Sequence, residues 1–561
     1  MAGPHDASST TTPSTTYANE TGGLILHADV LVIGGGPAGT WAALSAARSG
    51  AKVVLADKGY CGTSGATAPS NTGAWYLPAG AARDAEVDRR LEKSAGLADR
   101  RWIIRTMEEA LRGLDELGDD GYPFPFDEDG RPYRANLRGP DYMNHQRRRV
   151  RRAGVTILDH HPALELLWAD GVVAGAAGVE LRSGERWQVR AGAVVIAAGG
   201  CTFLSRALGC DGNTGDSYLL AAEAGAVFSG MEFSAQYGLS AAHATITKGL
   251  TFTFASFYLE DGSPLPSEGG DRSTRIARAM IAGHKVYALM NKGEAHEHDW
   301  LVRGQPNCFL PFERIGLDPF KERFPVTLRS EGTVRGTGGL DVTGDDCATN
   351  VPGLYVAGDA ASREKLVGAI SGGGSPNASW AIASGVWSGR GAAQFAQRQA
   401  GVLGDPLSTR LHTRAVHALG GAGLRPNKTA AGSGFTRELI AAVQDETLPL
   451  DVNFFRTGKR IALARAQLDG IWAAARDHLG GTGRELVRAR EAASMAATAR
   501  LVWASAQARD ESRGLHRRVD RDGSDPAQTH YIRSRGTDEL RVSTAPAPEA
   551  VRDLAEEALV S

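Results

Sequence analysis

A glycine-rich turn between two apolar runs constrains the fold of this chain more than any other feature. Residues 30–33 form a short apolar run rich in β-branched side chains, as in a strand that is buried on both faces. The motif Gly34-x-Gly36-x-x-Gly39 follows this run directly. A helical segment from about Ala38 to Arg48 comes next, and then a second apolar run at 52–56. This order, closed by Asp57, predicts a Rossmann-type dinucleotide-binding unit.

Each part of this unit has a physical role. Gly34 allows the tight turn, Gly36 lets backbone N–H groups approach a pyrophosphate, and Gly39 lets the helix pack close to the strand. The helix directs the positive end of its dipole at the phosphates. Asp57 is placed to hold the ribose hydroxyls. Because the unit lies near the N-terminus and a long remainder follows, we expect the dinucleotide to be FAD.

Composition sets further limits. The 561 residues are enough for three or four domain-sized units, and the net charge of −2 gives no sign of a nucleic-acid or anionic-membrane partner. The five cysteines form no CxxC pair, which argues against an iron–sulfur or zinc site and against a disulfide scaffold. There is no run of 18 apolar residues, so no membrane span is expected. Residues 1–23 are rich in Ser and Thr and lack the pattern of a signal peptide. We interpret them as a disordered lead-in, with the cytoplasm as the default location.

Other segments of the chain could reach the same ligand. The small-residue loop at 62–73 would let backbone lie against a flat ring, and a buried strand at 193–198 ends in Gly199 and Gly200. Asn213-Thr-Gly-Asp216 opens a helix, and a third apolar strand ends in Gly358-Asp359. A Ser-Gly-Gly-Gly-Ser stretch at 371–375 precedes a helix from about 377 to 398.

The remaining segments indicate a mixed α/β chain with a helical C-terminal part. Residues 81–118 have helical spacing of apolar side chains, and 172–181 with 186–189 are typical of a hairpin. The basic run 147–152 fits the solvated face of a helix better than an anion site. Residues 461–475 and 485–508, with Gly480 and Gly481 between them, predict an αα-hairpin.

These motifs together resemble one family. They occur in the order seen in the flavoproteins of fumarate reductase, succinate dehydrogenase, L-aspartate oxidase and the adenylylsulfate reductase α subunit, over residues 28–518. The further motifs that carry the resemblance are Gly338-Gly-Leu-Asp341, Val351-Pro-Gly-Leu-Tyr-Val-Ala-Gly-Asp359 and Asp510-Glu-Ser-Arg-Gly-Leu-His516.

The resemblance implies a Rossmann-type FAD-binding domain with an inserted α+β capping domain and a C-terminal helical domain. The FAD-binding domain would comprise two segments, 24–235 and 350–400, and the cap would comprise 236–349. The helical domain would span 401–520, followed by a C-terminal tail at 521–561.

The resemblance also implies hydride transfer between a substrate carbon and flavin N5, but several family residues are replaced. Gly65 stands where flavin-linked members have a histidine, so we expect non-covalent FAD. Val334 and Ser371 stand where the family has a histidine and an arginine of the dicarboxylate clamp, and the family's His-Pro-Thr element is replaced around Gln236-Tyr237-Gly238. We therefore expect a divergent member that acts on a small polar substrate other than succinate or fumarate.

The candidate site residues fall into two sets. For catalysis, Arg278 matches the family's proton-shuttling arginine, and Tyr237 and His243 are further candidates, with His284 and Arg335 as titratable or donor groups in or beside the cap. His296 and His298 fit a polar loop better than a metal site, so no metal is expected. The residues expected to bind FAD are Gly34, Gly36, Pro37, Ala38, Gly39, Asp57, Lys58, Thr63, Ser64, Gly65, Ala66, Ala198, Gly199, Asp216, Gly358, Asp359, Gly374 and Ser375.

The electron acceptor is left open by the sequence. The chain fits a stand-alone dehydrogenase or oxidase that uses dioxygen or a soluble carrier. It also fits a catalytic subunit that passes electrons to a separate iron–sulfur protein, or a flavin monooxygenase that uses NAD(P)H, although no second complete GxGxxG is present. A homo-oligomer is left open as well.

Overall fold

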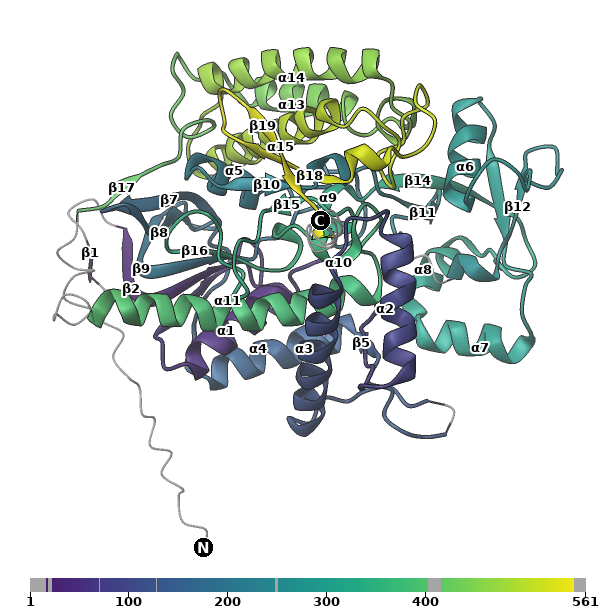
Figure 1. Cartoon of the computed structure of the whole chain (residues 1–561), viewed down its shortest axis with the longest axis horizontal. Coiled ribbons are helices and arrows are strands. Elements are labelled where there is room, and N and C mark those ends of the chain that lie inside the picture. Colours follow the sequence, from purple (N-terminus) through teal and green to yellow (C-terminus); the bar gives the residue numbers. More distant parts are fainter. Residues whose placement is uncertain are drawn as a thin grey trace, which may run out of the picture.

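The computed structural model describes residues 17–18, 23–69, 71–127, 129–247, 251–401 and 415–548. Most of the expected lead-in lies outside these residues; of 1–23, only Tyr17–Ala18 (β1) and Gly23 are described, and β1 pairs with β2. Figure 1 shows a sheet flanked by helices, a lobe at the right, and a layer of long helices at the top.

A nine-stranded sheet positions the cavity described below. Its central strands are parallel, since β16, β9, β2, β3 and β6 follow one another with Val30 opposite both Val53 and Ala193. β8 pairs with β9 in antiparallel fashion, as the expected hairpin predicts, and β7 extends the sheet by pairing with β8 in the same way. The bounds are β17 (His417–Ala418), β7 (Ala163–Ala169), β8 (Val172–Val179), β9 (Arg186–Ile196), β2 (Leu24–Ile33), β3 (Val53–Ala56), β6 (Thr156–Leu158) and β16 (Leu354–Val356).

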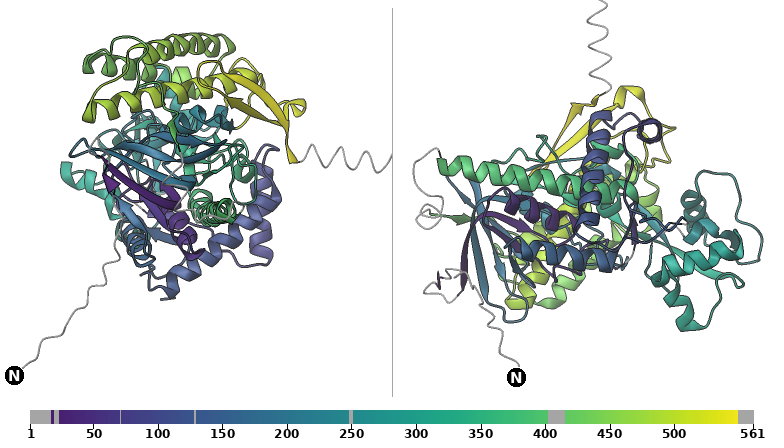
Figure 2. Two further views of the ribbon diagram at one scale, coloured as in Figure 1. Left: turned by 90° about the vertical axis from the view of Figure 1, so that its left-hand side faces the viewer. Right: turned by 90° about the horizontal axis from the view of Figure 1, so that it is seen from below.

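Two helices run together along this sheet, α1 (Pro37–Arg48) and α11 (Ser375–Gly401) (Figures 1 and 2). Two glycines of α11 explain how closely they pack. A Cβ at Gly385 would lie 2.6 Å from the carbonyl oxygen of Ala38, and one at Gly389 would lie 2.1 Å from that of Ala42. The first helix after the motif is therefore held against a helix more than 300 residues away along the chain.

The expected helical segment 81–118 is two helices, the second of which packs against α11. α2 (Ala81–Lys93) and α3 (Arg100–Asp119) are separated by residues with positive φ at Ala95 and Gly96, and Asp99 caps α3. The basic run belongs to α4 (Gly139–Arg152), but the expectation of a solvated face is wrong for Arg149. Its side chain is buried and pairs with Asp120 at 2.6 Å and with Glu116, because α4 packs against the end of α3.

The lobe at the right of Figure 1 has its own sheet and its own apolar core. The strands pair in the order β11, β14, β13, β12, all antiparallel. The bounds are β11 (Tyr237–Ala241), η2 (Thr251–Phe254), β12 (Ser256–Leu259), α6 (Arg272–Ile281), β13 (Val286–Leu289), α7 (Ala295–Gly304), α8 (Pro306–Ile315) and β14 (Phe324–Ser330). Residues 296 and 298 begin α7, so the expectation of a loop there is wrong; Glu294 and Glu297 form a capping box that starts the helix.

Long helices form the layer at the top of Figure 1. α14 (Gly458–His478) and α15 (Gly483–Ala508) pack against each other across a four-residue connection, as the expected αα-hairpin predicts. α13 (Ser433–Asp445) and the π-helical turn η4 (Leu450–Phe454) precede them.

A smaller sheet joins this layer to the rest of the chain. It contains β15 (Gly339–Leu340), β10 (Val227–Ser229), β18 (His530–Arg535) and β19 (Arg541–Pro546), so residues from the expected C-terminal tail pair with β10. Beside it, fully buried Arg509 forms ion pairs with Glu232 at 2.8 Å and Glu511 at 2.9 Å. The Glu-Ser-Arg element is thereby fixed to η1 (Met231–Phe233).

Shorter elements complete the described residues. They are α5 (Asp216–Glu223), α9 (Gly332–Arg335), η3 (Gly358–Ala360), α10 (Glu364–Val367), η5 (Pro526–Gln528), β4 (Asn71–Gly73) and β5 (Asn136–Arg138). Among all the described helices, none combines the length and the apolar character that a membrane span requires.

Candidate FAD site

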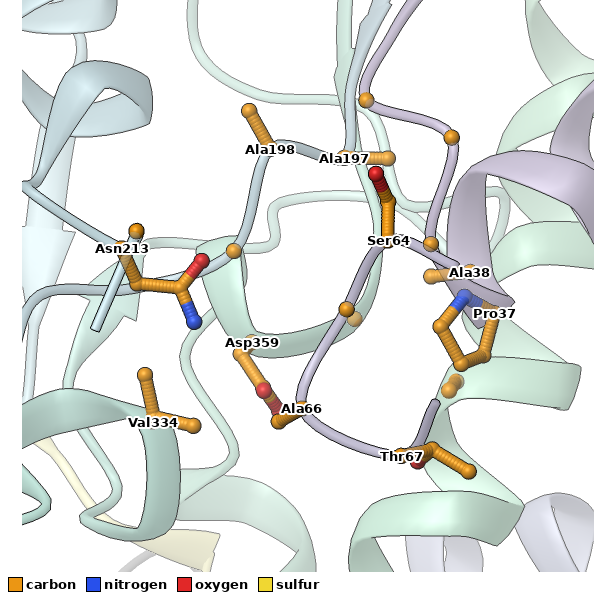
Figure 3. A pocket seen from close by; sticks show the side chains of 18 of the residues that line it. Pro37, Ala38, Ser64, Ala66, Thr67, Ala197, Ala198, Asn213, Val334 and Asp359 are labelled. Carbon is orange, nitrogen blue, oxygen red and sulfur yellow. The ribbon is translucent and has the colours of Figure 1, made fainter. Parts of the chain in front are cut away.

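A cavity of about 330 Å³ lies beyond the carboxyl ends of β2, β3, β9 and β16. This is the edge at which open parallel sheets bind nucleotides. Figure 3 shows side chains from separate segments around it, among them Asn213, Val334 and Asp359. We call residues 33–38 and 56–59 the motif wall, and Val334, Arg335, Gly374 and Asn377 the distal wall.

The three glycines of the Gly34-x-Gly36-x-x-Gly39 motif are required for different reasons. Gly34 has φ +111°, and a Cβ there would lie 2.4 Å from the carbonyl oxygen of Ala197. A Cβ at Gly39 would lie 1.8 Å from the carbonyl oxygen of Gly34. At Gly36, in contrast, φ is −73° and the nearest atom to a Cβ is the Cα of Gly65 at 3.5 Å, an ordinary contact. The protein itself does not need a glycine at 36, but a ligand that lies against this backbone does.

Gly36 is also the N-cap of α1 and supplies no side chain to the helix start. The first N–H groups of a helix lack intrahelical partners. Since Gly36, Pro37 and Ala38 all line the cavity, this helix end can bind a pyrophosphate through backbone donors and the helix dipole.

Asp57 is buried at the end of β3 and is held by the turns on either side of it. Its carboxylate accepts hydrogen bonds from the backbone N–H of Gly35, from the N–H of Gly59 at 2.5 Å and from the Ser64 hydroxyl at 2.8 Å. Burial is the largest influence on this group and raises its pKa. The small-residue loop is therefore joined to the motif wall through the acid that was expected to face the ribose.

Lys58 links the motif wall to the helical layer. Its ammonium donates to Asp216 at 2.7 Å, to Glu491 of α15 at 3.0 Å and to the Thr214 hydroxyl at 3.0 Å. Burial opposes the charged form, but the two carboxylates outweigh it and raise the pKa of Lys58. The side chain stays charged at the edge of the cavity, between α5 and α15.

The distal wall contains one cation. Arg335 is mostly buried, and its Nη1 lies 3.2 and 3.3 Å from the two carboxylate oxygens of fully buried Glu331 and 3.4 Å from the carbonyl oxygen of Thr247. Asn377 donates to the carbonyl oxygen of Val334 at 3.1 Å, while its own buried Oδ1 has no partner among the described residues. Asp359 at the cavity edge is paired with fully buried Arg363.

The structure brings the predicted FAD residues together, with three exceptions. Gly39 packs beneath the motif wall, Thr63 is exposed and donates to the carbonyl oxygen of Tyr60, and Ser375 begins α11 behind the lining. The predicted residues that line the cavity are Gly34, Gly36, Pro37, Ala38, Asp57, Lys58, Ser64, Gly65, Ala66, Ala198, Gly199, Asp216, Gly358, Asp359 and Gly374.

Sequence reasoning missed other lining residues. Asn213 is the first residue of the Asn-Thr-Gly-Asp motif, and Asn377 lies at the expected start of a helix. The sequence could therefore have indicated both as lining residues. Val334 and Arg335 precede the Gly338–Asp341 motif, and the sequence draws attention to them only through the clamp and the cap. The remaining missed residues include Thr67, Thr72, Gly209, Gly212 and Leu220.

The three residues predicted for catalysis do not line this cavity. Arg278 is exposed, donates to the carbonyl oxygen of Gly269 at 2.6 Å and lies over the ring of Phe455. Tyr237 is buried and donates to the carbonyl oxygen of Leu448 at 3.0 Å. His243 is exposed and packs edge-on against Phe312. Their catalytic role stays a prediction.

The site and the fold together define an FAD-binding protein. Residues 29–285 match a family described as FAD binding domain, and residues 444–546 match one described as fumarate reductase flavoprotein C-term. The space beside the Gly36 backbone, the start of α1 without a side-chain cap and the cavity at the carboxyl ends of the parallel strands all fit such a dinucleotide.

Known proteins resemble this chain over most of its length. One component of the fumarate reductase (CoM/CoB) of Methanothermobacter marburgensis is 26% identical, over 88% of this chain and 95% of the relative. L-aspartate oxidase of Mycobacterium leprae is 27% identical, over 87% of this chain and 91% of the relative. The chain thus has an FAD binding domain and a fumarate reductase flavoprotein C-terminal domain, is similar along its length to fumarate reductase and L-aspartate oxidase, and is an FAD-dependent oxidoreductase.

Solved structures show the same fold. A quinol fumarate reductase variant of E. coli superposes with a TM-score of 0.75 at 21% identity, covering 93% of this chain and 97% of that one. Adenylylsulfate reductase from Archaeoglobus fulgidus superposes with a TM-score of 0.74 at 17% identity, covering 96% of this chain and 98% of that one.

Proposed function

We propose that this chain transfers a hydride between non-covalently bound FAD and a small polar substrate other than succinate or fumarate. The observation that carries the proposal is the composition of the distal wall, where Arg335 is the one cation and Val334 lies beside it. FAD, when bound, supplies the acceptor or donor of the hydride. The residues of this chain supply binding, orientation and exclusion of water.

Arg335 is the residue that we propose to hold the substrate. Within the described part of the chain, its hydrogen bonds all use Nη1 and are 3.3–3.4 Å long, so its Nε and Nη2 remain to donate to a polar group of the substrate. Glu331 fixes the guanidinium from behind. Other charged groups on the cavity are committed elsewhere, since Lys58 pairs with Asp216 and Glu491 and Asp359 pairs with Arg363.

A dicarboxylate fits this wall poorly. Ser371, at the position where the family has a clamp arginine, donates to the carbonyl oxygen of Arg335 at 2.9 Å. Val334 offers no donor at the position of the clamp histidine. One carboxylate of succinate would therefore lack partners, at a cost of about 1.5–3 kcal/mol for each missing charged hydrogen bond.

The position of Gly65 supports non-covalent FAD. Its φ is +95°, and a Cβ there would lie 2.8 Å from the Cδ of Pro37. A linking histidine at 65 would therefore clash with the first turn of α1. We expect acid precipitation of the holoprotein to release the yellow colour into the supernatant; colour that stays in the pellet would contradict a non-covalent bond.

The domain division is part of the proposal: FAD-binding segments 24–235 and 350–400, a cap at 236–349 that covers the substrate, a helical domain at 401–520 and a tail at 521–561. Two amide side chains support the cap assignment. Asn71 donates to the carbonyl oxygen of Gly304 at 2.6 Å, and Asn307 donates to that of Pro69 at 2.8 Å. The lobe thus contacts the small-residue loop, several residues of which line the cavity.

The proposal is tested by anaerobic bleaching of the bound flavin. The panel should contain amino, hydroxy and dicarboxylic acids, steroids and sulfur nucleotides. We expect one polar class to reduce the flavin, and succinate to leave it oxidised. Steady-state turnover of succinate or fumarate near the typical enzymic range of about 1–1000 per second would overturn the proposal.

A second candidate is a catalytic subunit that passes electrons to an iron–sulfur protein. The names of relatives favour it, since several are called subunits of fumarate reductases. The five cysteines of this chain are all buried and form no disulfide, so a cluster would belong to a partner. Rapid reoxidation of the reduced flavin by dioxygen would favour the stand-alone enzyme, whereas co-purification with a cluster protein that accelerates reoxidation would favour the subunit.

A further inference from the structure

We propose that the lobe formed by 236–349 carries a second binding site, for a phosphate-type oxyanion, between η2, β12 and α6. A cavity of about 230 Å³ lies there, several times the ~30 Å³ that one water occupies in the liquid. It shares no lining residue with the FAD cavity. Figure 1 shows α6 and β12 in the lobe, at the right-hand side of the molecule.

Three cations from two segments of the chain line this cavity. Arg272 is the first residue of α6, Arg275 lies one turn further along, and Lys292 follows β13. None of the three forms an ion pair with a carboxylate among the described residues, although many arginines of this molecule do. Asp271, the nearest acid in sequence, is occupied as the N-cap that accepts from the N–H of Thr274.

The hydrogen bonds of the two arginines leave donors unused. Arg272 donates through Nη1 to the carbonyl oxygen of Phe252 at 2.8 Å, and Arg275 donates through Nη1 to that of Pro266 at 2.7 Å. These bonds hold both guanidinium groups in place. The Nε of Arg275 is buried and has no partner among the described residues. An unpaired buried donor is costly, and an anion in the cavity would remove that cost.

Electrostatics favour the same occupant. Burial is the largest influence on Arg272 and lowers its pKa; the Asp271 carboxylate offsets part of this, and the positive charge of Arg275 lowers the pKa further. Two like charges held beside each other are stabilised by an anion placed between them. The cavity also lies at the first turn of α6, where the helix dipole adds positive potential. A guanidinium presents its donors in a planar fork that suits phosphate oxygens.

Two kinds of ligand share this chemistry. One is a free inorganic oxyanion, phosphate or sulfate, and the other is the phosphate group of a nucleotide. Phe252 and Phe257 line the cavity as well, and Arg272 lies 5.6 Å from the ring centroid of Phe257. Aromatic faces next to cations can accept a base. The site therefore takes a tetrahedral oxyanion, and the titration series decides what that oxyanion is attached to.

The test is calorimetric titration of the FAD-loaded protein with inorganic phosphate, sulfate, AMP and adenosine. We expect saturable phosphate binding, weakened about tenfold or more by Arg275→Gln or Lys292→Gln, since each removes a charged donor. Lys292 is exposed, so its substitution spares the fold. Arg303→Gln is the matched control, because Arg303 is an exposed arginine on α7 that does not line the cavity.

Each outcome decides the proposal. Tighter binding of AMP than of phosphate, with no binding of adenosine, identifies a nucleotide; equal binding identifies a free oxyanion, and both support the site. Absence of saturable binding overturns it. So does an equal loss in Arg303→Gln, which would indicate a general charge effect, or binding by the FAD-free protein alone, which would place the anion at the FAD site.

Discussion

The motif wall and the distal wall of the FAD cavity differ in how the chain builds them. The motif wall comes from one stretch of sequence, 33–59, in which backbone and glycine do most of the binding. The distal wall brings together α9 and the start of α11, and its chemistry depends on the side chains of Arg335 and Asn377. Cofactor binding at the motif wall therefore depends on local backbone geometry, whereas the substrate choice that we propose depends on the side chains of the distal wall.

The largest effect is expected at the motif wall. Gly36→Val should abolish FAD binding and leave a folded apoprotein, because a Cβ at this position meets no protein atom closer than 3.5 Å, whereas a pyrophosphate needs the space beside this backbone. Gly39→Ala is the contrasting variant: its Cβ would meet the carbonyl oxygen of Gly34, so it should lower the melting temperature even without flavin. Flavin content and thermal unfolding of the two apoproteins measure this. Full flavin content in Gly36→Val would contradict the site.

The next effect is expected at the distal wall. Arg335→Lys keeps a charge beside buried Glu331 but replaces the planar fork with a point charge. The variant should keep its FAD and lose about 100-fold in kcat/KM for the true substrate, as expected for a lost charged hydrogen bond. A change of less than a few-fold would remove Arg335 from the substrate site. A lower FAD content than in the parent protein would show that the two walls are not independent.

Lys58 tests whether the motif wall depends on a distant part of the chain. Lys58→Gln would remove the ammonium that Asp216 and Glu491 share, beside a cavity that must accept a pyrophosphate; Asp216 would keep the Thr214 hydroxyl at 2.8 Å and Glu491 would keep Arg488 at 3.5 Å. We expect FAD to bind about tenfold more weakly, and the melting temperature to fall. Lys58→Arg should restore most of the loss, and adding Glu491→Gln to Lys58→Gln should restore part of the stability. Unchanged FAD affinity would limit Lys58 to holding α15 against α5.

The same contrast explains what the sequence could predict. The strand, the turn, the helix and the acid of the motif wall are adjacent in sequence. The local pattern alone therefore predicted this wall and the role of each of its parts. Even there, Asp57 has its oxygens bonded to Gly35, Gly59 and Ser64, a detail that depends on how the loop folds back. The αα-hairpin and the β-hairpin of 172–181 with 186–189 were likewise predicted by local periodicity.

Contacts between distant segments could not be predicted in this way. Gly385 and Gly389 carry no motif, yet their missing side chains let α11 lie on α1. Arg149 belongs to a run of six residues of which five are arginine, and only the packing of α4 on α3 shows that this one is buried between two acids. Glu491 lies more than 400 residues from Lys58. Such pairings follow from tertiary packing, which single-sequence patterns do not contain.

The smallest effect concerns Arg278, the arginine that the sequence favoured for proton transfer. In the structure it lies in the lobe, outside both walls, bonded to the carbonyl oxygen of Gly269 and placed 5.6 Å from the ring centroid of Phe455. A lysine can keep the cation–π contact, which contributes about 0.5–1 kcal/mol at exposed sites. Arg278→Lys should therefore change kcat/KM by no more than a few-fold and lower the melting temperature slightly.

The same substitution at Arg335 and Arg278 makes this a matched comparison, with Arg303→Lys as an exposed control on α7. A general acid or base contributes about 100-fold or more to turnover. If Arg278→Lys loses that much while it keeps its FAD and its melting temperature, the lobe must move so that Arg278 reaches the substrate, and the sequence-based assignment is right. If only Arg335→Lys loses activity, the substrate is held by the distal wall, and Arg278 joins the lobe to the helical layer through Phe455.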